Sequence, residues 1–129
     1  MRKIKFRCWD IANKKMRSDK DLWDIAYNEI FIHTPDQRAL NIMQYTGLKD
    51  INGTEIYEGD IVEYVNKGTK GIGKIVYGLY DNEHQTDLGY YIQWLNQEYW
   101  RNDLGYWKKK GIEVRGNIYE NPTLLEEDR

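Results

Sequence analysis

The chain has few of the residues that mark metal-binding, redox and secreted proteins. Its 129 residues include one cysteine, two histidines and two prolines. A single thiol cannot form an internal disulfide, so cysteine usage does not indicate a secreted scaffold. Metal sites draw several His, Cys or carboxylate ligands at short spacings, whereas His33 and His84 are far apart in the sequence and neither is near Cys8. We therefore expect no metal or other cofactor, and we interpret Cys8 as a small buried hydrophobe.

Long apolar runs are also missing. No stretch approaches the roughly 20 apolar residues of a membrane span, and no apolar run of signal-peptide length follows the basic N-terminus. The sequence thus predicts a cytoplasmic protein. A formal net charge of −2 does not favour nucleic acid as the partner, although the charge is uneven. Residues 1–20 carry eight Lys or Arg against two Asp, and residues 21–63 carry two against nine Asp or Glu.

Motifs of known catalytic chemistry are absent. There is no nucleophile elbow, phosphate-binding loop or dinucleotide fingerprint, and the glycines of 68–73 lack phosphate-loop spacing. Carboxylates are plentiful near predicted turns, at Glu55, Glu58, Asp60 and Glu63. A general acid needs a desolvated pocket, which a sequence does not reveal. We therefore expect a non-enzyme, and an enzyme whose site is not visible in the sequence is the least favoured alternative.

Aromatic residues are abundant, with five Trp, eleven Tyr and two Phe. Tyr and Trp favour strands, because their flat rings pack on pleated surfaces, and their polar tips suit partly exposed positions. Period-two alternation supports β structure: Ile4, Phe6 and Cys8 fall on one face of an N-terminal strand. The predicted strands cover about residues 3–9, 28–33, 61–65, 73–78, 88–94 and 112–118.

The remaining segments are assigned from turn and helix signals. Residues 17–27 allow a short helix with Ser18 or Asp19 as N-cap, and Pro122 suits the first position of a short C-terminal turn or helix. Turn residues dominate from Leu40 to Tyr64, where Asn52-Gly53 is the strongest hairpin signal. Residues 68–73 and 81–87 are predicted loops, the latter a candidate mobile loop, and 105–107 is a possible short strand.

Two basic segments contain interleaved aromatic residues. The first is Lys3, Lys5, Arg7 and Trp9 on one strand face, and the second is Trp100, Arg101, Tyr106 and Trp107 beside Lys108, Lys109 and Lys110. Such surfaces suit single-stranded nucleic acid, because cations follow phosphates and rings stack on bases. A solvated strand face and a charged hairpin tip explain the same residues, and the acidic overall charge favours this structural reading. These residues are the candidate partner-binding set.

Three blocks of the sequence resemble the YopX family. They are Ile4–Asp10, the block Met43–Val62 and Gly116–Pro122, which stand in the family's order and span nearly the whole chain. The resemblance implies a phage or prophage protein of the bacterial cytoplasm, built around a small antiparallel SH3-like barrel. It implies no activity, because no molecular function is established for the family. Residues 12–41 and 66–110 match no family motif and are candidates for a partner-specific surface.

The combined prediction is a mainly β, single-domain protein with an SH3-like barrel, an N-terminal strand or hairpin extension and little helix. The arm covers about residues 1–45, the barrel about 46–121 and the tail 122–129. Gly59 and Asp60 are given architectural roles: Gly59 permits a sharp turn and Asp60 accepts hydrogen bonds from nearby backbone N–H groups. We expect a non-catalytic module that binds a host or phage macromolecule, with a protein preferred and nucleic acid as the alternative.

Overall fold

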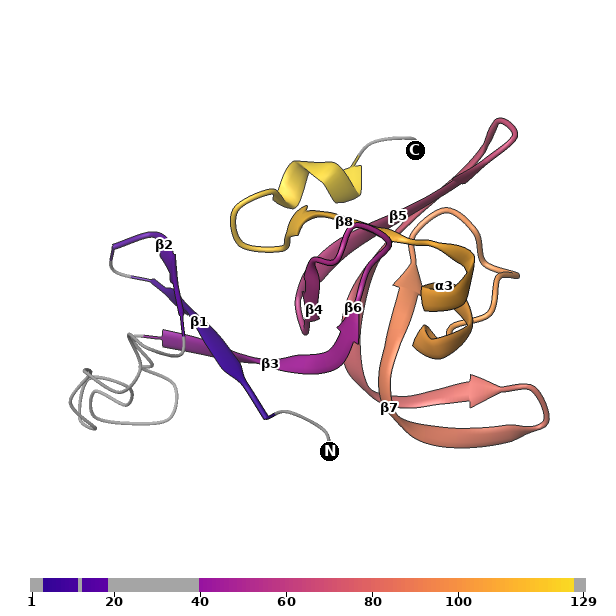
Figure 1. Ribbon diagram of the computed structural model, residues 1–129, viewed down its shortest axis with the longest axis horizontal. Coiled ribbons are helices and arrows are strands. Elements are labelled where there is room, and N and C mark those ends of the chain that lie inside the picture. Colours follow the sequence, from indigo (N-terminus) through magenta and orange to yellow (C-terminus); the bar gives the residue numbers. More distant parts are fainter. Residues whose placement is uncertain (1–3, 12, 19–39, 127–129) are drawn as a thin grey trace. The chain divides into compact units, whose positions relative to one another are not determined.

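The computed structural model describes residues 4–11, 13–18 and 40–126 (Figure 1). These residues are mainly β-strand with little helix, as the sequence predicts. Contacts between residues divide the chain into two compact units, Met1–Tyr45 and Thr46–Arg129. The single-domain organisation inferred from the sequence stays a prediction.

The first unit is built on strand β1, Phe6–Asp10. This strand lies between β2, Lys15–Arg17, and β3, Leu40–Lys49, and pairs antiparallel with both. Cys8 is fully buried, which confirms its interpretation as a core residue. Phe6 remains 39% exposed although it shares a strand face with Cys8, so burial falls off toward the start of β1.

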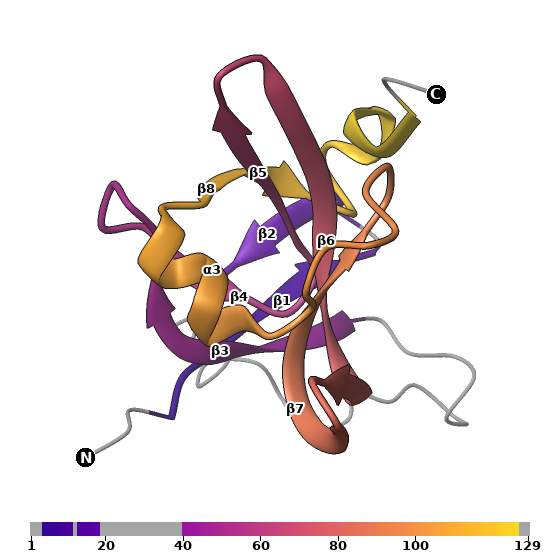
Figure 2. The ribbon, with the colours of Figure 1, turned by 90° about the vertical axis from the view of Figure 1, so that its right-hand side faces the viewer.

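The second unit contains a four-stranded antiparallel sheet in the order β7-β6-β5-β8. Its strands are β5, Asp60–Asn66; β6, Thr69–Asn82; β7, Gln85–Trp94; and β8, Glu113–Asn117. The end of β3 enters this unit and neighbours the short strand β4, Glu55–Tyr57. The tips of the β5–β6 and β6–β7 hairpins lie at opposite ends of the unit (Figure 2).

The core of the second unit lies between this sheet and one short helix, α3, Leu104–Lys110. A cluster of buried aliphatic and aromatic side chains fills it: Ile56, Val62, Ile75, Ile92, Trp94, Leu104, Trp107 and Ile112. Ile56, Val62, Ile75 and Ile92 are β-branched and suit the pleated strands on which they lie. After β8, a 3-10 helix at Pro122–Glu126 begins with proline, as the sequence predicts.

The predicted turn residues have the expected geometry at two positions. Gly53 and Gly59 both adopt positive φ, +84° and +88°, which is the left-handed region that glycine tolerates best. The Asp60 side chain is buried, and its carboxylate accepts a 2.7 Å hydrogen bond from the backbone N–H of Tyr57. The architectural roles assigned to Gly59 and Asp60 are therefore confirmed.

Several predicted loops are wrong. The segment 68–73 lies mostly in β6, because Lys67 and Gly68 alone form the turn that pairs Asn66 with Thr69. Both turn residues have positive φ, as a tight two-residue hairpin requires. The segment 81–87 is likewise a hairpin tip, whose strands continue to Asn82 and resume at Gln85. Residues 40–49, read as turn-rich, form strand β3.

The predicted strand at 105–107 is also wrong, because these residues belong to helix α3. Leu104 and Trp107 are three residues apart and both are buried, so they share one helix face. Gly111 ends the helix at φ +102°, with its N–H bonded to the carbonyl of Trp107. Lys108, Lys109 and Lys110 occupy the last turn, where cations favour the helix dipole.

Two other predictions concern residues that the structure does not describe. The strand at 28–33 lies wholly outside the described residues, and so does most of the predicted helix at 17–27. At the start of that predicted helix, Arg17 is the last residue of strand β2.

Candidate functional site

The candidate residues around Trp100 form a packed aromatic cluster. Trp100 and Trp107 stack with ring centroids 4.9 Å apart and planes at 25°. Tyr64 and Trp94 meet both rings edge-on, at centroid distances of 5.0 to 5.9 Å. Trp107 is only 5% exposed. A buried ring has no free face on which a base could stack, so Trp107 is a core residue and not a stacking platform.

Trp100 is fixed from its other side by a glycine of β6. A Cβ atom at Gly71 would overlap the Trp100 ring, so the indole lies directly on the strand backbone there. Because glycine alone has no side chain, it permits this close approach. The ring of Trp100 is thus held between Gly71 and Trp107, and its exposure is partial.

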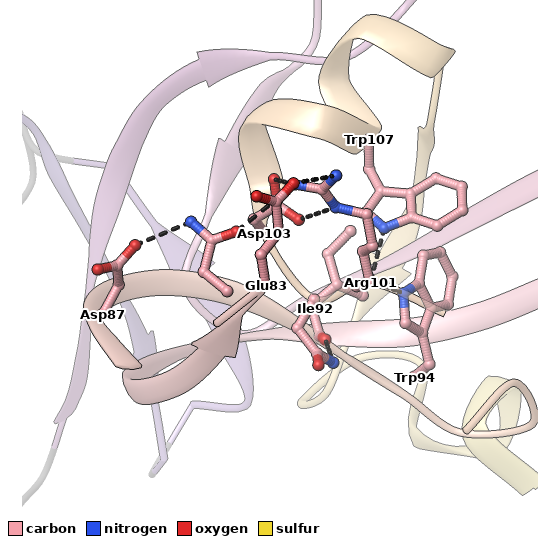
Figure 3. A network of polar contacts seen from close by, with 9 residues as sticks. Glu83, Asp87, Ile92, Trp94, Arg101, Asp103 and Trp107 are labelled. Atoms are coloured by element: carbon pink, nitrogen blue, oxygen red, sulfur yellow. Dashed lines mark hydrogen bonds and ion pairs between the residues drawn. The ribbon is translucent and has the colours of Figure 1, made fainter. Parts of the chain in front are cut away.

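The backbone of Arg101 joins two members of the cluster. Its carbonyl oxygen accepts hydrogen bonds from the indole N–H groups of Trp94 and Trp107, at 2.8 Å and 2.6 Å (Figure 3). Buried indole N–H groups require acceptors, and one carbonyl has two lone pairs. This arrangement explains why the segment before α3 follows the sheet so closely.

The guanidinium of Arg101 is neutralised by carboxylates (Figure 3). It donates to both oxygens of Asp103, at 2.8 Å and 3.0 Å, and to Glu83 at 3.1 Å. The hydrogen bonds to Asp103 raise the pKa of Arg101 above its ordinary value. The guanidinium also lies over the ring of Tyr106, 4.6 Å from its centroid. A cation with two carboxylate partners offers less attraction to a phosphate.

The structure therefore brings together part of the candidate set. Trp100, Arg101, Tyr106 and Trp107 contact one another, and Lys108 lies exposed next to them on α3. Lys5, Arg7 and Trp9 belong to the first unit and are half-buried, while Lys3 lies outside the described residues. Whether any of these residues binds a partner stays a prediction.

Two of the carboxylates considered for catalysis, Asp60 and Glu63, have structural roles. Glu63 forms an ion pair with Lys70 at 3.4 Å and lies 3.9 Å from Arg115, and Asp60 holds the turn after β4. His84 is exposed in the β6–β7 turn, whereas His33 lies outside the described residues. No group of three or more His, Cys, Asp or Glu side chains among the described residues is arranged to hold a metal ion.

A second surface, which the sequence did not suggest, lies on the β6–β7 hairpin. Tyr77 pairs with Tyr90 and Leu79 with Leu88, so these four side chains share one face of the hairpin. Tyr77, Leu79 and Leu88 are 54%, 69% and 64% exposed. We call these three residues the apolar hairpin face. The hairpin extends away from helix α3, toward the lower right in Figure 1.

The signal for this surface was present but incomplete. Alternation places Leu88, Tyr90, Ile92 and Trp94 on one strand face, and of these four only Ile92 and Trp94 are buried. The strand continues beyond the core, so the same periodicity runs from buried into exposed positions. Large exposed apolar groups that are adjacent on a face mark interaction sites more often than scattered ones do.

These observations define a small, mainly β protein with a packed aromatic core and one apolar hairpin face. Its sequence matches the model of the family described as YopX protein over residues 5–126. The chain therefore belongs to the YopX family. The resemblance seen in the three sequence blocks is confirmed.

A solved structure has a similar fold. The crystal structure of protein EF1440 from Enterococcus faecalis is similar to this chain, with a TM-score of 0.61 and 26% sequence identity. The similarity covers 97% of this chain and 99% of the other. No curated protein matches the chain. Among the described residues, no helix combines the length and the apolar character needed to cross a membrane.

Proposed function

We propose that this YopX-family chain is a non-catalytic binding protein of a phage or prophage, and that it recognises a protein in the bacterial cytoplasm. The apolar hairpin face carries the proposal. Three large side chains there remain more than half exposed, although the unit has a well-packed core elsewhere. Exposed Tyr and Leu side chains gain free energy when a protein partner removes them from water.

The SH3-like barrel remains part of this proposal. The curved sheet β7-β6-β5-β8, with β4 in the same unit, is compatible with a small barrel of that class. Barrels of this kind commonly present loops and hairpins to partners, which is an argument by analogy between folds. The phage or prophage origin rests on family membership in the same way.

Affinity capture from host cells tests the proposal. The full-length protein should retain a specific host or phage protein, and the double variant Leu79→Ser with Leu88→Ser should lose most of it. Val65→Ser is the matched control, because Val65 is 58% exposed on the β5–β6 hairpin at the opposite end of the unit. Equal capture by the wild type and the double variant would show that the apolar hairpin face is not the binding surface.

Nucleic acid is the second candidate, and the three lysines of α3 favour it. Lys108, Lys109 and Lys110 are exposed, and no ion pair to a carboxylate is found for them among the described residues. Affinity for a single-stranded oligonucleotide should then fall steeply with salt, and the triple change to Gln should flatten that dependence. We expect no binding at physiological salt, because Trp107 is buried and Arg101 is neutralised.

A further inference from the structure

The outer part of strand β7 is an open sheet edge. β7 is the first strand of the order β7-β6-β5-β8, so one of its sides has no neighbouring strand in the sheet. Its inner part is covered: Ile92 donates to the carbonyl of Asn102 at 2.8 Å, and the Asn102 side chain donates to the carbonyl of Ile92 at 2.7 Å. Both backbone groups of Ile92 thus point away from β6.

Alternation extends this geometry along the strand. In an antiparallel pair every second residue directs its N–H and C=O to the same side, and the register from Gly73–Trp94 to Asn82–Gln85 has no shift. Leu88 and Thr86 therefore also point their backbone groups outward. For these two residues, no partner for the outward groups is found in the part of the chain that the structure describes.

The opposite edge of the same sheet is protected. On β8, the N–H of Val114 donates to the carboxylate of Asp50 at 2.8 Å, and the N–H of Asn117 donates to the side chain of Asn121 at 3.2 Å. Proteins cover or charge their sheet edges, because an uncovered edge is a template for another strand. The contrast with β8 and with the inner part of β7 marks Thr86–Leu88 as a place for strand addition.

The two faces beside this edge differ in chemistry. On one face, Leu88 of the apolar hairpin face lies next to any added strand, and Leu79 follows one strand further, on β6. On the other, the side-chain amide of Asn82 donates to the Asp87 carboxylate at 2.8 Å (Figure 3). The side-chain amide of Gln85 donates to its second oxygen at 3.1 Å. Side chains of an added strand alternate between these faces.

The charge of this region is acidic. From residue 75 to 100 the chain has no Lys or Arg, and it carries Asp81, Glu83, Asp87 and Glu98. Arg101 neutralises Glu83 alone of these four, at 3.1 Å. Opposite charges directly across a strand pair stabilise it, and like charges destabilise it. The edge therefore favours a strand with basic side chains on the side of Asp87.

A second copy of the chain fits this edge poorly. If two β7 strands paired through the outward groups of Thr86 and Leu88, Thr86 would lie opposite Leu88 of the other copy. The two Asp87 carboxylates would then stand directly opposite each other. In that register the charge pattern disfavours a copy of the same strand and favours a foreign one.

We propose that an extended segment of another protein, with alternating apolar and basic residues, adds to the sheet along Thr86–Leu88. Its apolar side chains lie beside Leu88 and extend the apolar hairpin face, and its basic side chains lie beside Asp87. The proposal rests on the proposed protein-binding function and names the chemistry of the partner at the same hairpin.

Synthetic peptides test this proposal on the full chain. The probe is a labelled, acetylated peptide of sequence Lys-Val-Lys-Val-Lys-Val-Lys, and the control has the shuffled order Lys-Lys-Val-Val-Val-Lys-Lys. We expect the alternating peptide to bind at least about tenfold tighter by fluorescence anisotropy, because two outward residues offer several backbone hydrogen bonds. The amide signals of Thr86 and Leu88 should shift in nuclear magnetic resonance spectra. Equal affinity of the two peptides would overturn the proposal.

Protein variants separate the edge from the face. Leu88→Pro removes the outward N–H, and proline is tolerated on an edge strand where that N–H faces solvent, so we expect binding to fall by about tenfold or more. Leu88→Ser keeps the N–H and should weaken binding less. Asp87→Asn should reduce the preference for the basic peptide over a Glu-Val alternating one. Unchanged binding by Leu88→Pro would exclude pairing at this edge.

A further arm does not depend on how well a variant folds. N-methylation of every second peptide residue blocks strand pairing and preserves charge, so it should abolish binding to the wild-type protein if the methyl groups face the edge. Sedimentation without peptide tests whether a second copy of the chain occupies the edge. A dimer that dissociates in the Leu88→Pro variant would show that the β7 edge serves self-association, and would overturn the proposal. None of these readouts depends on capture from host cells, so failure of the peptide leaves the capture result to judge the proposed function separately.

Discussion

Among the polar side chains of the second unit, we expect the loss of the Asp50 carboxylate to reduce the free energy of unfolding most. One oxygen accepts from the N–H groups of Asn52 and Thr54, at 2.8 Å and 2.9 Å, and the other accepts from Val114 at 2.8 Å. The side chain thus closes the turn after β3 and covers the edge of β8, which lies 64 residues later. Asp50 is only 8% exposed, so after its carboxylate is removed water can take over only some of its hydrogen bonds.

The magnitude follows from the surroundings of the three donors. The N–H groups of Asn52 and Thr54 lie in an exposed turn and can bond to water after a change of Asp50 to Ala, so each should cost about 0.5 kcal/mol. Val114 is half-buried, and loss of a charged acceptor there should cost about 1.5–3 kcal/mol. We therefore expect Asp50→Ala to lower the free energy of unfolding by about 2.5–4 kcal/mol.

Urea denaturation followed by near-ultraviolet circular dichroism measures this loss, because the Trp cluster of the same unit reports its packing. The m-value should stay unchanged, since the same surface is exposed on unfolding. Asp81→Ala is the matched control: Asp81 is an exposed aspartate, and no hydrogen bond or ion pair of its side chain is found within the described residues. A loss below about 0.5 kcal/mol for Asp50→Ala, equal to the control, would refute the reasoning.

Three further changes have expected outcomes. Gly53→Val should cost at least about 1 kcal/mol in chemical denaturation through strain at φ +84°, since no atom lies within 4 Å of a Cβ there. Gly71→Ala should displace Trp100 and change the tryptophan fluorescence spectrum, because the new methyl group overlaps its ring. The hydrogen bonds from Asn13 lower the pKa of Asp10. Asp10 therefore stabilises the folded state fully above its unfolded pKa of about 3.9, and this contribution is lost as pH falls through its lower folded pKa. Asp10→Asn should remove that part of the pH dependence of unfolding.

Local pattern was sufficient where apolar β-branched residues cluster. In β5, Ile61 and Val62 are fully buried and the predicted range of 61–65 lies within the observed strand. Local pattern failed at residues 68–73, which were predicted as a loop, because a two-residue turn at Lys67 and Gly68 joins β5 directly to β6. Lys67 adopts φ +50° beside Gly68, and lysine is not a residue that indicates a two-residue hairpin turn. The turn is imposed by the long pairing of β5 with β6 on either side of it.

Helix α3 shows a different limit. Its signals were present in the sequence, with Gly111 at one end and Leu104 and Trp107 three residues apart. Seven residues give few hydrogen bonds for the cost of nucleation, so an isolated segment of this length is not stable as a helix. Packing of Trp107 into the core and the bond from its indole N–H to the Arg101 carbonyl supply what the local sequence lacks.

The candidate site shows why aromatic content alone does not locate a binding surface. Trp100 and Trp107 stand beside Arg101 and three lysines in the sequence, which is the composition of a nucleic-acid platform. Their exposure is decided by residues far away: Gly71 leaves room for the Trp100 ring, and Tyr64 packs on Trp107. Burial of an aromatic side chain is therefore a property of tertiary pairing.

The apolar hairpin face is the converse case. Leu79 and Leu88 have the alternation of core residues, yet they lie where β6 and β7 extend past the rest of the sheet. Strand length relative to the neighbouring strands decides their exposure: β6 has 14 residues and β5 has seven. The pairing of β5 with β6 stops at Lys74, and the N–H of Gly59 donates to the carbonyl of Ile75. Beyond Ile75, β7 is the one strand of the sheet beside β6 among the described residues. A hairpin that outgrows its sheet presents two faces and the outer edges of both its strands, and the edge of β7 is the one on which a partner strand can be tested.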